Sequence, residues 1–192
     1  MASHFLAMLF RMKYIYRWGL MRNSRQENLS EHTLETAFIA HALAAIAKRR
    51  LNREVDPAKV ALCAMFHDVS EIITGDMPTP VKYYNPEIIK AYKQIEQGAR
   101  GRLLGMLSQD LLPEYEEALS GGDDYIKTLV RAADKLSALI KCIEELAQGN
   151  REFEVAYRQT LRTIDSMGLE EVEIFKEEFL ESFRLSLDEQ KL

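Results

Sequence analysis

Three titratable side chains interrupt an apolar run near the middle of the chain. The stretch CAMFHDVSEIITG, residues 63–75, contains His67, Asp68 and Glu71 within five positions. Burying such groups without partners costs several kcal/mol, so they are expected to be paired or to bind a metal ion. This stretch alone leaves both interpretations open: a polar network that faces Lys or Arg of another helix, or a metal site.

Two residues elsewhere in the chain could complete such a site. The chain has four histidines: His4, His32, His41 and His67. His32 and His41 are nine residues apart, so they point to opposite faces of a helix and cannot serve one site. Asp134 interrupts an apolar face in LVRAADKLSALI. Taken singly, His32 also fits a capping or surface role, and Asp134 fits a surface pair with Arg131 or Lys135.

Taken together, four of these residues form a plausible set of metal ligands. The set comprises His32, His67, Asp68 and Asp134. Two imidazoles and two carboxylates make a mixed nitrogen and oxygen donor set that suits a first-row divalent ion. An octahedral ion would keep about two open positions for water and a substrate oxygen, as hydrolysis requires. The sequence therefore predicts one divalent metal ion, and the shortage of histidines argues against a second.

The elements that carry these residues are predicted to be helices. The chain has 192 residues, 47% of them hydrophobic, with only nine Gly and five Pro, and β-branched runs are scarce. This composition predicts one compact all-α domain over residues 1–192. Asn28 with Glu31 three residues later starts a helix that runs to about residue 50. Asp56 and Pro57 start the next helix, which Gly75 ends, over about 57–74.

The remaining chain is also predicted to be helical. They are expected at about 3–16, from Asn85 onward, from Pro113, and over about 125–148, 151–166 and 169–187. Gly98, Gly101 and Gly105 either weaken their helix or permit a neighbour to pack closely. The candidate ligands thus come from three helices. Exposed apolar faces on the last two helices are the expected dimer interface.

Charge and composition exclude several classes of protein. The net charge of −5 argues against a nucleic-acid binder, which needs a long basic face. No apolar segment approaches the roughly 18 residues that a membrane span requires. Cys63 and Cys142 both lie in apolar helical stretches, which is typical of free buried thiols in a reducing compartment. A cytoplasmic location is therefore predicted, with neither membrane nor nucleic acid as a partner.

The pattern of His32, His67-Asp68 and Asp134 resembles the HD-domain metal-dependent phosphohydrolases. Other segments narrow the resemblance to the bacterial 5'-deoxynucleotidases of that superfamily, over about residues 3–188. These segments are RMKYIYRW (11–18), LMRN (20–23), ENLSEH (27–32), HDVSE (67–71), TGDMPTPVKY (74–83) and KCIEELAQGN (141–150). The resemblance implies a compact all-helical HD domain that forms a homodimer.

The resemblance also implies an activity and a set of roles. The activity is hydrolysis of deoxyribonucleoside 5'-monophosphates to deoxynucleosides and phosphate, selective against ribonucleotides, with one divalent ion per subunit: cobalt, manganese or copper. The implied metal ligands are His32, His67, Asp68 and Asp134. Glu71 is the implied catalytic carboxylate, Arg17 orients the phosphate, and Trp18 lies against the sugar. The implied substrate contacts also include Asp68 and the loop Asp76, Met77, Pro78 and Thr79, with Asp76 assisting catalysis.

Other interpretations remain. Without the resemblance, Arg17 fits a solvated surface arginine and Trp18 fits a core or interface anchor. One alternative function is another HD-type nucleotide phosphohydrolase, but triphosphate binding should need more basic residues near the site than Arg17 and Lys82. The other is a non-catalytic helical metal-binding regulatory module. Structural metal sites are closed by protein ligands, whereas here Glu71 remains free, which favours catalysis.

Overall fold

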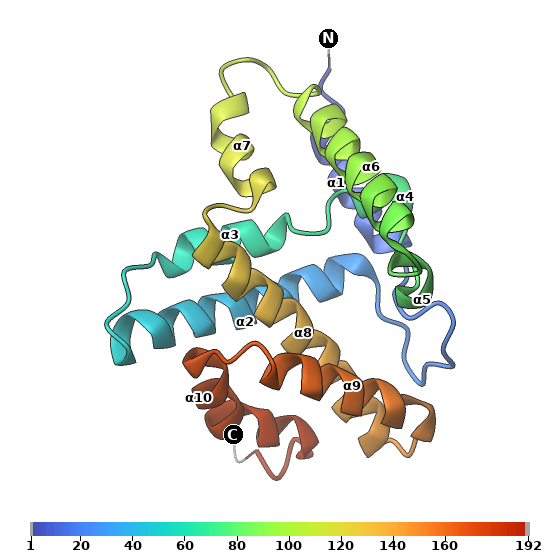
Figure 1. Cartoon of the computed structure of the whole chain (residues 1–192), viewed down its shortest axis with the longest axis vertical. Helices are drawn as coiled ribbons and strands as arrows, with labels where there is room; N and C mark the ends of the chain where they lie inside the picture. The colour runs from blue at the N-terminus through green and yellow to red at the C-terminus, as the bar shows by residue number, and fades with distance from the viewer. Residues whose placement is uncertain (1, 191–192) are drawn as a thin grey trace.

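The computed structural model describes residues 2–190, and helices dominate them (Figure 1). The α-helices are α1 (Phe5–Leu9), α2 (Leu29–Arg50), α3 (Pro57–Met65), α4 (Glu71–Thr74), α5 (Thr79–Lys82), α6 (Pro86–Leu104), α7 (Leu112–Ser120), α8 (Asp124–Ala147), α9 (Glu154–Asp165) and α10 (Glu170–Phe179). The 3₁₀ helices are η1 (Phe10–Tyr14), η2 (Arg151–Phe153) and η3 (Leu180–Arg184). No strand occurs in residues 2–190, where one isolated bridge joins Tyr16 to Asn28. The predicted all-α fold is confirmed.

Helices α2 and α8 form the centre of the molecule, and α3 packs beside α2. The last two α-helices pack onto this centre, α9 against α8 and α10 against α2 (Figure 1). Their apolar faces make the main core, in which Leu43 of α2, Val60 of α3 and Leu139 of α8 are fully buried. A second apolar cluster lies beside α1 and η1 and includes Phe5 and Val69. The chain passes from one cluster to the other between α3 and α4.

Capping residues set the helix starts as the sequence predicts. The Asn28 side chain accepts hydrogen bonds from the backbone N–H groups of Ser30 and Glu31, and Glu31 accepts one from the Asn28 N–H. This reciprocal pair satisfies donors that the first turn of α2 would otherwise leave free. Asp56 caps α3 by a single hydrogen bond from the Ala58 N–H, and Asn85 caps α6 by one from the Ile88 N–H, both without a reciprocal bond. The capped start of α2 also fixes the position of His32 in the first turn of this helix.

The prediction of one helix over 57–74 is wrong. Helix α3 ends at Met65, residues 66–70 form tight turns, and α4 covers only Glu71–Thr74 before Gly75 at φ +71°. In the turns, the N–H groups of Phe66, His67 and Val69 bond to carbonyls three residues back rather than four. This tighter winding carries the chain across the seam between the two apolar clusters. His67 and Asp68 therefore lie on an irregular segment, and Glu71 belongs to a different helix from the one predicted.

Three other predicted helices are divided. The predicted helix at 3–16 is α1 followed by η1, that at 151–166 is η2 followed by α9, and that at 169–187 is α10 followed by η3. Gly98 and Gly101 have open space where a Cβ would lie, so no neighbour packs closely against them. Gly105 meets only the backbone of its own helix. The close-packing interpretation of these glycines is wrong.

Two composition-based predictions can be compared with this fold. Cys63 and Cys142 are both buried free thiols, as predicted. Within residues 2–190, no helix combines the length and apolar character that a bilayer crossing demands.

Candidate metal centre and active site

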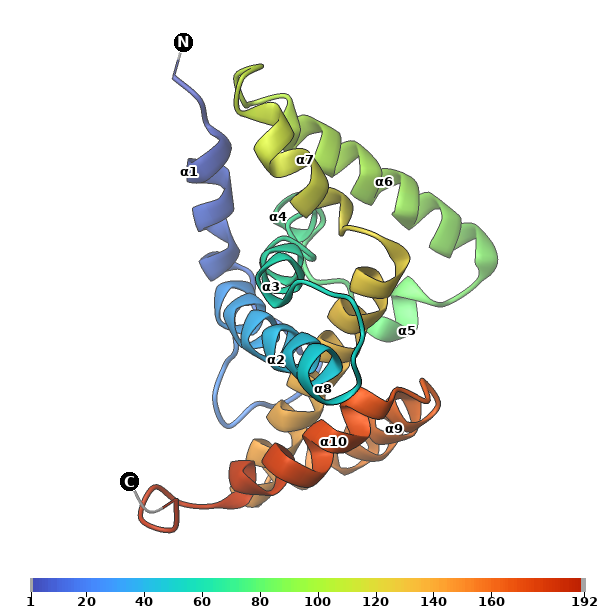
Figure 2. The ribbon, with the colours of Figure 1, turned by 90° about the vertical axis from the view of Figure 1, so that its left-hand side faces the viewer.

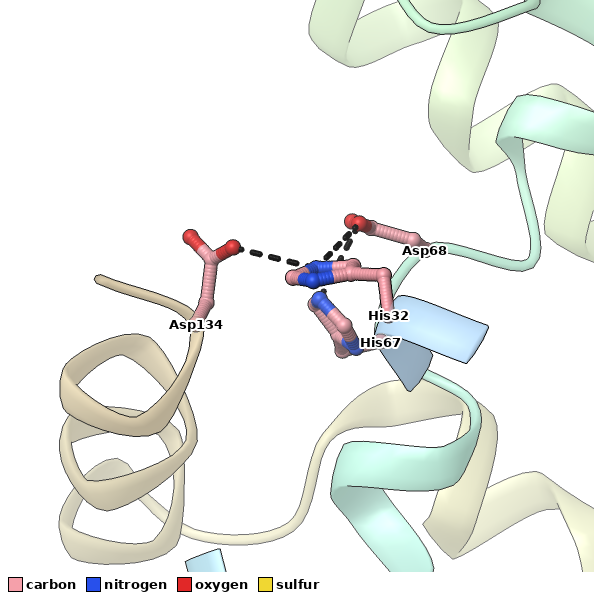
Figure 3. A group of neighbouring side chains, drawn as sticks. All are labelled: His32, His67, Asp68 and Asp134. Carbon is pink, nitrogen blue, oxygen red and sulfur yellow. Dashed lines mark ion pairs between the residues drawn. The ribbon is translucent and has the colours of Figure 1, made fainter. Parts of the chain in front are cut away.

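Four side chains from three parts of the fold converge on one point (Figure 3). His32 comes from the first turn of α2, His67 and Asp68 from the turns after α3, and Asp134 from α8. One donor atom of each lies within 4.8 Å of the donor atoms of the others. His32 Nε2 is 3.3 Å from Asp134 Oδ1 and 3.6 Å from Asp68 Oδ2. The structure thus brings together all four residues that the sequence selected.

The orientation of His67 suits a metal ion. Its Nδ1 lies 2.7 Å from the carbonyl oxygen of Ala64, which can only accept, so Nδ1 carries a hydrogen. In the neutral ring, Nε2 then presents a lone pair to Asp68 Oδ2 at 3.0 Å. This nitrogen is buried and has no hydrogen-bond partner. A lone pair that faces a carboxylate calls for a cation between them, either a proton or a metal ion.

His32 is oriented from behind in the same manner. Its ring is fully buried, and Nδ1 lies 3.1 Å from Ser137 Oγ and 3.6 Å from Glu27 Oε1. With Nδ1 donating to Ser137 Oγ, Nε2 points toward Asp68 and Asp134. Hydrogen bonds of this type fix the tautomer and the ring angle of histidine ligands in metalloproteins. The local packing of α2 against α8 therefore prepares His32 as a donor.

The charges of the cluster favour a bound cation. Burial raises the pKa of Asp134, but hydrogen bonding from His32 and the charge of Lys135 outweigh it and hold that pKa well below its usual range. Burial also acts against ionised Asp68, yet His67 and His32 lower its pKa. Burial lowers the pKa of His67, and Asp68 and Asp134 more than compensate, raising it to about 9. Two ionised carboxylates and two imidazoles fit a divalent ion.

Glu71 lies next to the cluster but is not part of it. Its side chain is buried, Oε2 has no hydrogen-bond partner, and Oε1 is 3.9 Å from Lys82 Nζ. Burial, followed by the charges of Asp68 and Asp76, raises the pKa of Glu71 to about 9, although Lys82 and Arg17 oppose this. A neighbouring divalent cation would lower that pKa. The carboxyl group is therefore placed to hold a proton or to release one.

Glu27 connects the cluster to the residues expected to bind substrate, and the sequence analysis did not select it. Its Oε1 accepts from Arg17 Nη1 at 2.9 Å, and its Oε2 accepts from Trp18 Nε1 at 2.8 Å. Arg17 Nη2 also lies 3.8 Å from Asp134 Oδ1. Arg17 is only 12% exposed, so the surface interpretation is wrong. Glu27 begins the ENLSEH segment that carries the family resemblance, but nothing in its residue type or spacing marks it as a partner of Arg17 and Trp18.

Trp18 has a strained backbone that several contacts maintain. Its φ of +60° lies in the left-handed region that residues other than Gly rarely adopt. Glu27 holds the indole, whose ring is tilted against Phe153 with centroids 5.3 Å apart. The Trp18 backbone carbonyl accepts hydrogen bonds from the Met21 N–H and the Asn23 side chain. Strain of this kind persists only where the surroundings impose it, often at a binding site.

A network around Glu145 of α8 holds the rest of the loop between η1 and α2. Glu145 is 1% exposed and accepts from the backbone N–H and hydroxyl of Ser24, from Asn150 and from Lys141. These bonds lower the pKa of Glu145 to about 2, against the effect of burial, so it stays ionised. The loop that carries Arg17 and Trp18 is thus tied to α8, the helix that carries Asp134.

A cavity of about 640 Å³ adjoins these residues, and we call it the Trp18 cavity. All the predicted substrate-contacting residues outside the metal cluster line it: Arg17, Trp18, Asp76, Met77, Pro78 and Thr79. Ala156, Gln159 and Thr160 of α9 line it as well, and sequence reasoning missed them. No local pattern marks them, because only the packing of α9 brings them to the loop.

We expect the substitution His67→Ala to weaken divalent-cation binding by more than the roughly 10- to 100-fold that loss of an outer hydrogen-bond partner costs. The reason is that it removes a donor nitrogen from the cluster. Titration calorimetry of chelated protein with Mn²⁺ or Co²⁺ measures the effect. His41→Ala is the matched control, because His41 is exposed on the far face of α2. Equal affinities for the two variants would exclude His67 as a ligand.

Comparison with known proteins agrees with the geometry. A family model described as 5'-deoxynucleotidase YfbR-like matches residues 4–183. A 5'-deoxynucleotidase from Photobacterium profundum is 47% identical over 191 residues, covering 97% of each chain. The 5'-deoxynucleotidase YfbR of Escherichia coli O127:H6 is 48% identical over 189 residues, covering 97% of this chain and 95% of that one.

Solved structures share the fold. An HD-domain phosphohydrolase from Listeria innocua superposes with a TM-score of 0.80 at 22% identity, covering 98% of this chain and 92% of that one. The cyanophage S-2L HD phosphohydrolase DatZ, bound to dA and one catalytic Zn²⁺ ion, gives a TM-score of 0.66 at 18% identity, covering 92% and 96%. From the family match and the near-complete coverage of its relatives, the chain belongs to the YfbR-like 5'-deoxynucleotidase family, with an HD-domain fold.

Proposed function

We propose that this protein is a metal-dependent 5'-deoxynucleotidase that converts deoxyribonucleoside 5'-monophosphates to deoxynucleosides and phosphate and discriminates against ribonucleotides. One observation supports this most strongly. Glu27 binds both Arg17 and Trp18, and the same Arg17 lies 3.8 Å from Asp134 of the metal cluster. A cation site, a phosphate-binding fork and a flat ring beside a cavity are therefore adjacent. The curated relatives bear the 5'-deoxynucleotidase name.

Phosphate monoester hydrolysis is very slow without a catalyst, so the site must supply on the order of 20 kcal/mol of transition-state stabilisation. A divalent ion held by the four proposed ligands would supply Lewis-acid polarisation of a phosphoryl oxygen and a lower pKa for water. Cobalt, manganese and copper are the proposed ions. The guanidinium of Arg17 presents two parallel N–H groups to phosphate oxygens. Because Glu27 holds Arg17 in place, little reorganisation accompanies binding.

Glu71 is the proposed catalytic carboxylate. It is buried one short turn beyond Asp68, and one of its oxygens has no partner. In this position it can orient the attacking water or pass a proton toward the leaving 5'-oxygen. Asp76 is the proposed second acid, since burial raises its pKa and Arg17 opposes that rise. Asp76 lines the Trp18 cavity together with Trp18 and Arg17, which supports a role beside both the sugar and the phosphate.

Trp18 is the proposed reason for selectivity toward deoxyribose. Packed against C2' of the sugar, the indole leaves neither space nor a hydrogen-bond partner for a 2'-hydroxyl group. Asp76 and Thr79 line the same cavity and offer oxygens for the 3'-hydroxyl or the leaving oxygen. Pro78 and Pro80 stiffen this loop. The buried Cys63 and Cys142 thiols support a reducing compartment, so the cytoplasm is the proposed location.

The direct test is phosphate release from matched pairs of deoxyribo- and ribonucleoside 5'-monophosphates. Chelated protein should be inactive, and added Co²⁺ or Mn²⁺ should restore turnover of the deoxy forms only. Trp18→Ala should reduce the preference for dAMP over AMP by about tenfold or more, because the wall beside C2' is removed. Equal turnover of dAMP and AMP by the unaltered protein would refute the selectivity. Silence with every metal would favour a non-catalytic metal-binding module.

Substituting Glu71 by Gln tests its role separately from metal binding. We expect Glu71→Gln to bind Mn²⁺ within a few-fold of the unaltered protein and to lose about 10²- to 10⁴-fold in kcat, the range for removal of a general acid or base. Steady-state kinetics and calorimetry measure the two effects. Glu87→Gln is a suitable control, because Glu87 is an exposed acid on α6 that lines neither cavity. Full turnover by Glu71→Gln would remove Glu71 from the mechanism.

The family resemblance also leads us to propose a homodimer. Large apolar side chains are exposed on α1, η1 and the start of α2, including Phe10 at 68% and Phe38 at 65%. Helix η1 packs against α2, so these exposed side chains form a second candidate interface, in addition to the one expected on the last two helices. Phe38→Glu should convert dimer to monomer in sedimentation equilibrium, while Val155→Glu on α9 should not. The opposite result would favour the last two helices.

A further inference from the structure

A second cavity adjoins the metal cluster, and His67 and Asp134 form part of its wall. Its volume is about 430 Å³. The rest of its wall comes chiefly from α6, the end of α7 and α8. Figure 2 shows how these helices follow one another on one side of the molecule. Tyr83 and Lys135 line this cavity and the Trp18 cavity alike. The two cavities therefore meet near the same centre.

The wall of this second cavity is basic, and we call it the basic cavity. Its acidic lining residues are Glu96 and Asp134. Its basic lining residues are Lys82, Lys93, Arg100, Lys127, Arg131 and Lys135. The chain as a whole has a net charge of −5, so this concentration of positive charge is local. A recess lined by one sign of charge raises the local concentration of the opposite ion.

Several of these cations have no counter-ion. Lys82 pairs with Glu96 at 3.3 Å, and Lys135 pairs with Asp134 at 2.9 Å. Among the residues that the structure describes, Lys93, Arg100 and Arg131 have no acidic partner within 4.0 Å.

Arg100 points most directly to a ligand. Its Nε is buried and has no hydrogen-bond partner in the described part of the chain. A buried donor left unpaired is costly and uncommon in native proteins, so its presence calls for an acceptor. The acceptor that a guanidinium binds best is a carboxylate or a phosphate, and Glu96, one turn away on α6, pairs with Lys82 rather than with Arg100.

We propose that the basic cavity is a phosphate-anion subsite next to the catalytic centre, which receives the phosphate that hydrolysis releases. The proposal rests on the proposed function. With the nucleoside in the Trp18 cavity, phosphate would leave through the basic cavity, so the two products would follow separate routes. The same chemistry would also hold the outer phosphate of a nucleoside diphosphate. Sequence reasoning counted only Arg17 and Lys82, because the basic residues are scattered over 82–135.

The test compares two double variants of the full chain loaded with Mn²⁺. Lys93→Gln with Arg100→Gln removes two charges from the cavity. Lys90→Gln with Arg102→Gln removes two charges from the same helix, at exposed positions that do not line the cavity. Calorimetric titration with inorganic phosphate at fixed ionic strength should show about tenfold weaker binding for the cavity variant, about 1.4 kcal/mol. The control variant should bind within twofold of the unaltered protein.

The outcomes separate this inference from the proposed function. Equal affinity of the two double variants both for inorganic phosphate and for a deoxynucleoside 5'-diphosphate, with both variants folded by circular dichroism, would overturn the subsite. A repeat with a deoxynucleoside 5'-diphosphate identifies the source: a loss confined to that probe assigns the cavity to an outer phosphate, and a loss with inorganic phosphate assigns it to the product. If the unaltered protein hydrolyses no deoxynucleotide but the cavity variant binds phosphate more weakly than the control variant, the proposed function fails while the anion subsite stands.

Discussion

The gathering of Asp68 and Asp134 around two imidazoles is the constraint on which the rest of the structure depends. Two ionised, largely buried carboxylates repel each other unless a cation lies between them. Three segments of the chain carry these four residues: the capped start of α2, the tight turns after α3, and the middle of α8. Each place fixes the direction of a donor from behind, as Ser137 does for His32 and the Ala64 carbonyl does for His67.

A second set of buried acids positions the substrate side. Glu27 holds Arg17 and Trp18, and Glu145 ties their loop to α8 through Ser24. Because α8 also carries Asp134, the proposed phosphate-binding residue Arg17 and the candidate metal ligands share one support. The strained backbone of Trp18 is consistent with this arrangement, because hydrogen bonds on several sides of the residue offset the energetic cost of its positive φ angle. Positioning of this kind favours catalysis because groups need not reorganise during the reaction.

Local sequence patterns predicted the features that short-range interactions determine. The caps at Asn28, Asp56 and Asn85 follow from short-range hydrogen bonding, and the free cysteines follow from apolar surroundings. The helix break at 66–70 could not be predicted, because this segment contains neither Gly nor Pro and only the crossing between two clusters requires it.

The same limit applies to the candidate site. His32, His67, Asp68 and Asp134 could be grouped from residue type and family resemblance. The contacts of Glu27 depend on how the loop between η1 and α2 folds back, and the α9 wall of the Trp18 cavity and the basic cavity depend on long-range packing, so residue type and spacing did not predict them. The central claim is that one divalent ion binds to the four grouped residues. Anomalous diffraction from crystals grown with Mn²⁺ tests it most directly: we expect one peak per chain, within bonding distance of His32, His67, Asp68 and Asp134. A peak elsewhere, or none at this cluster, would contradict the account.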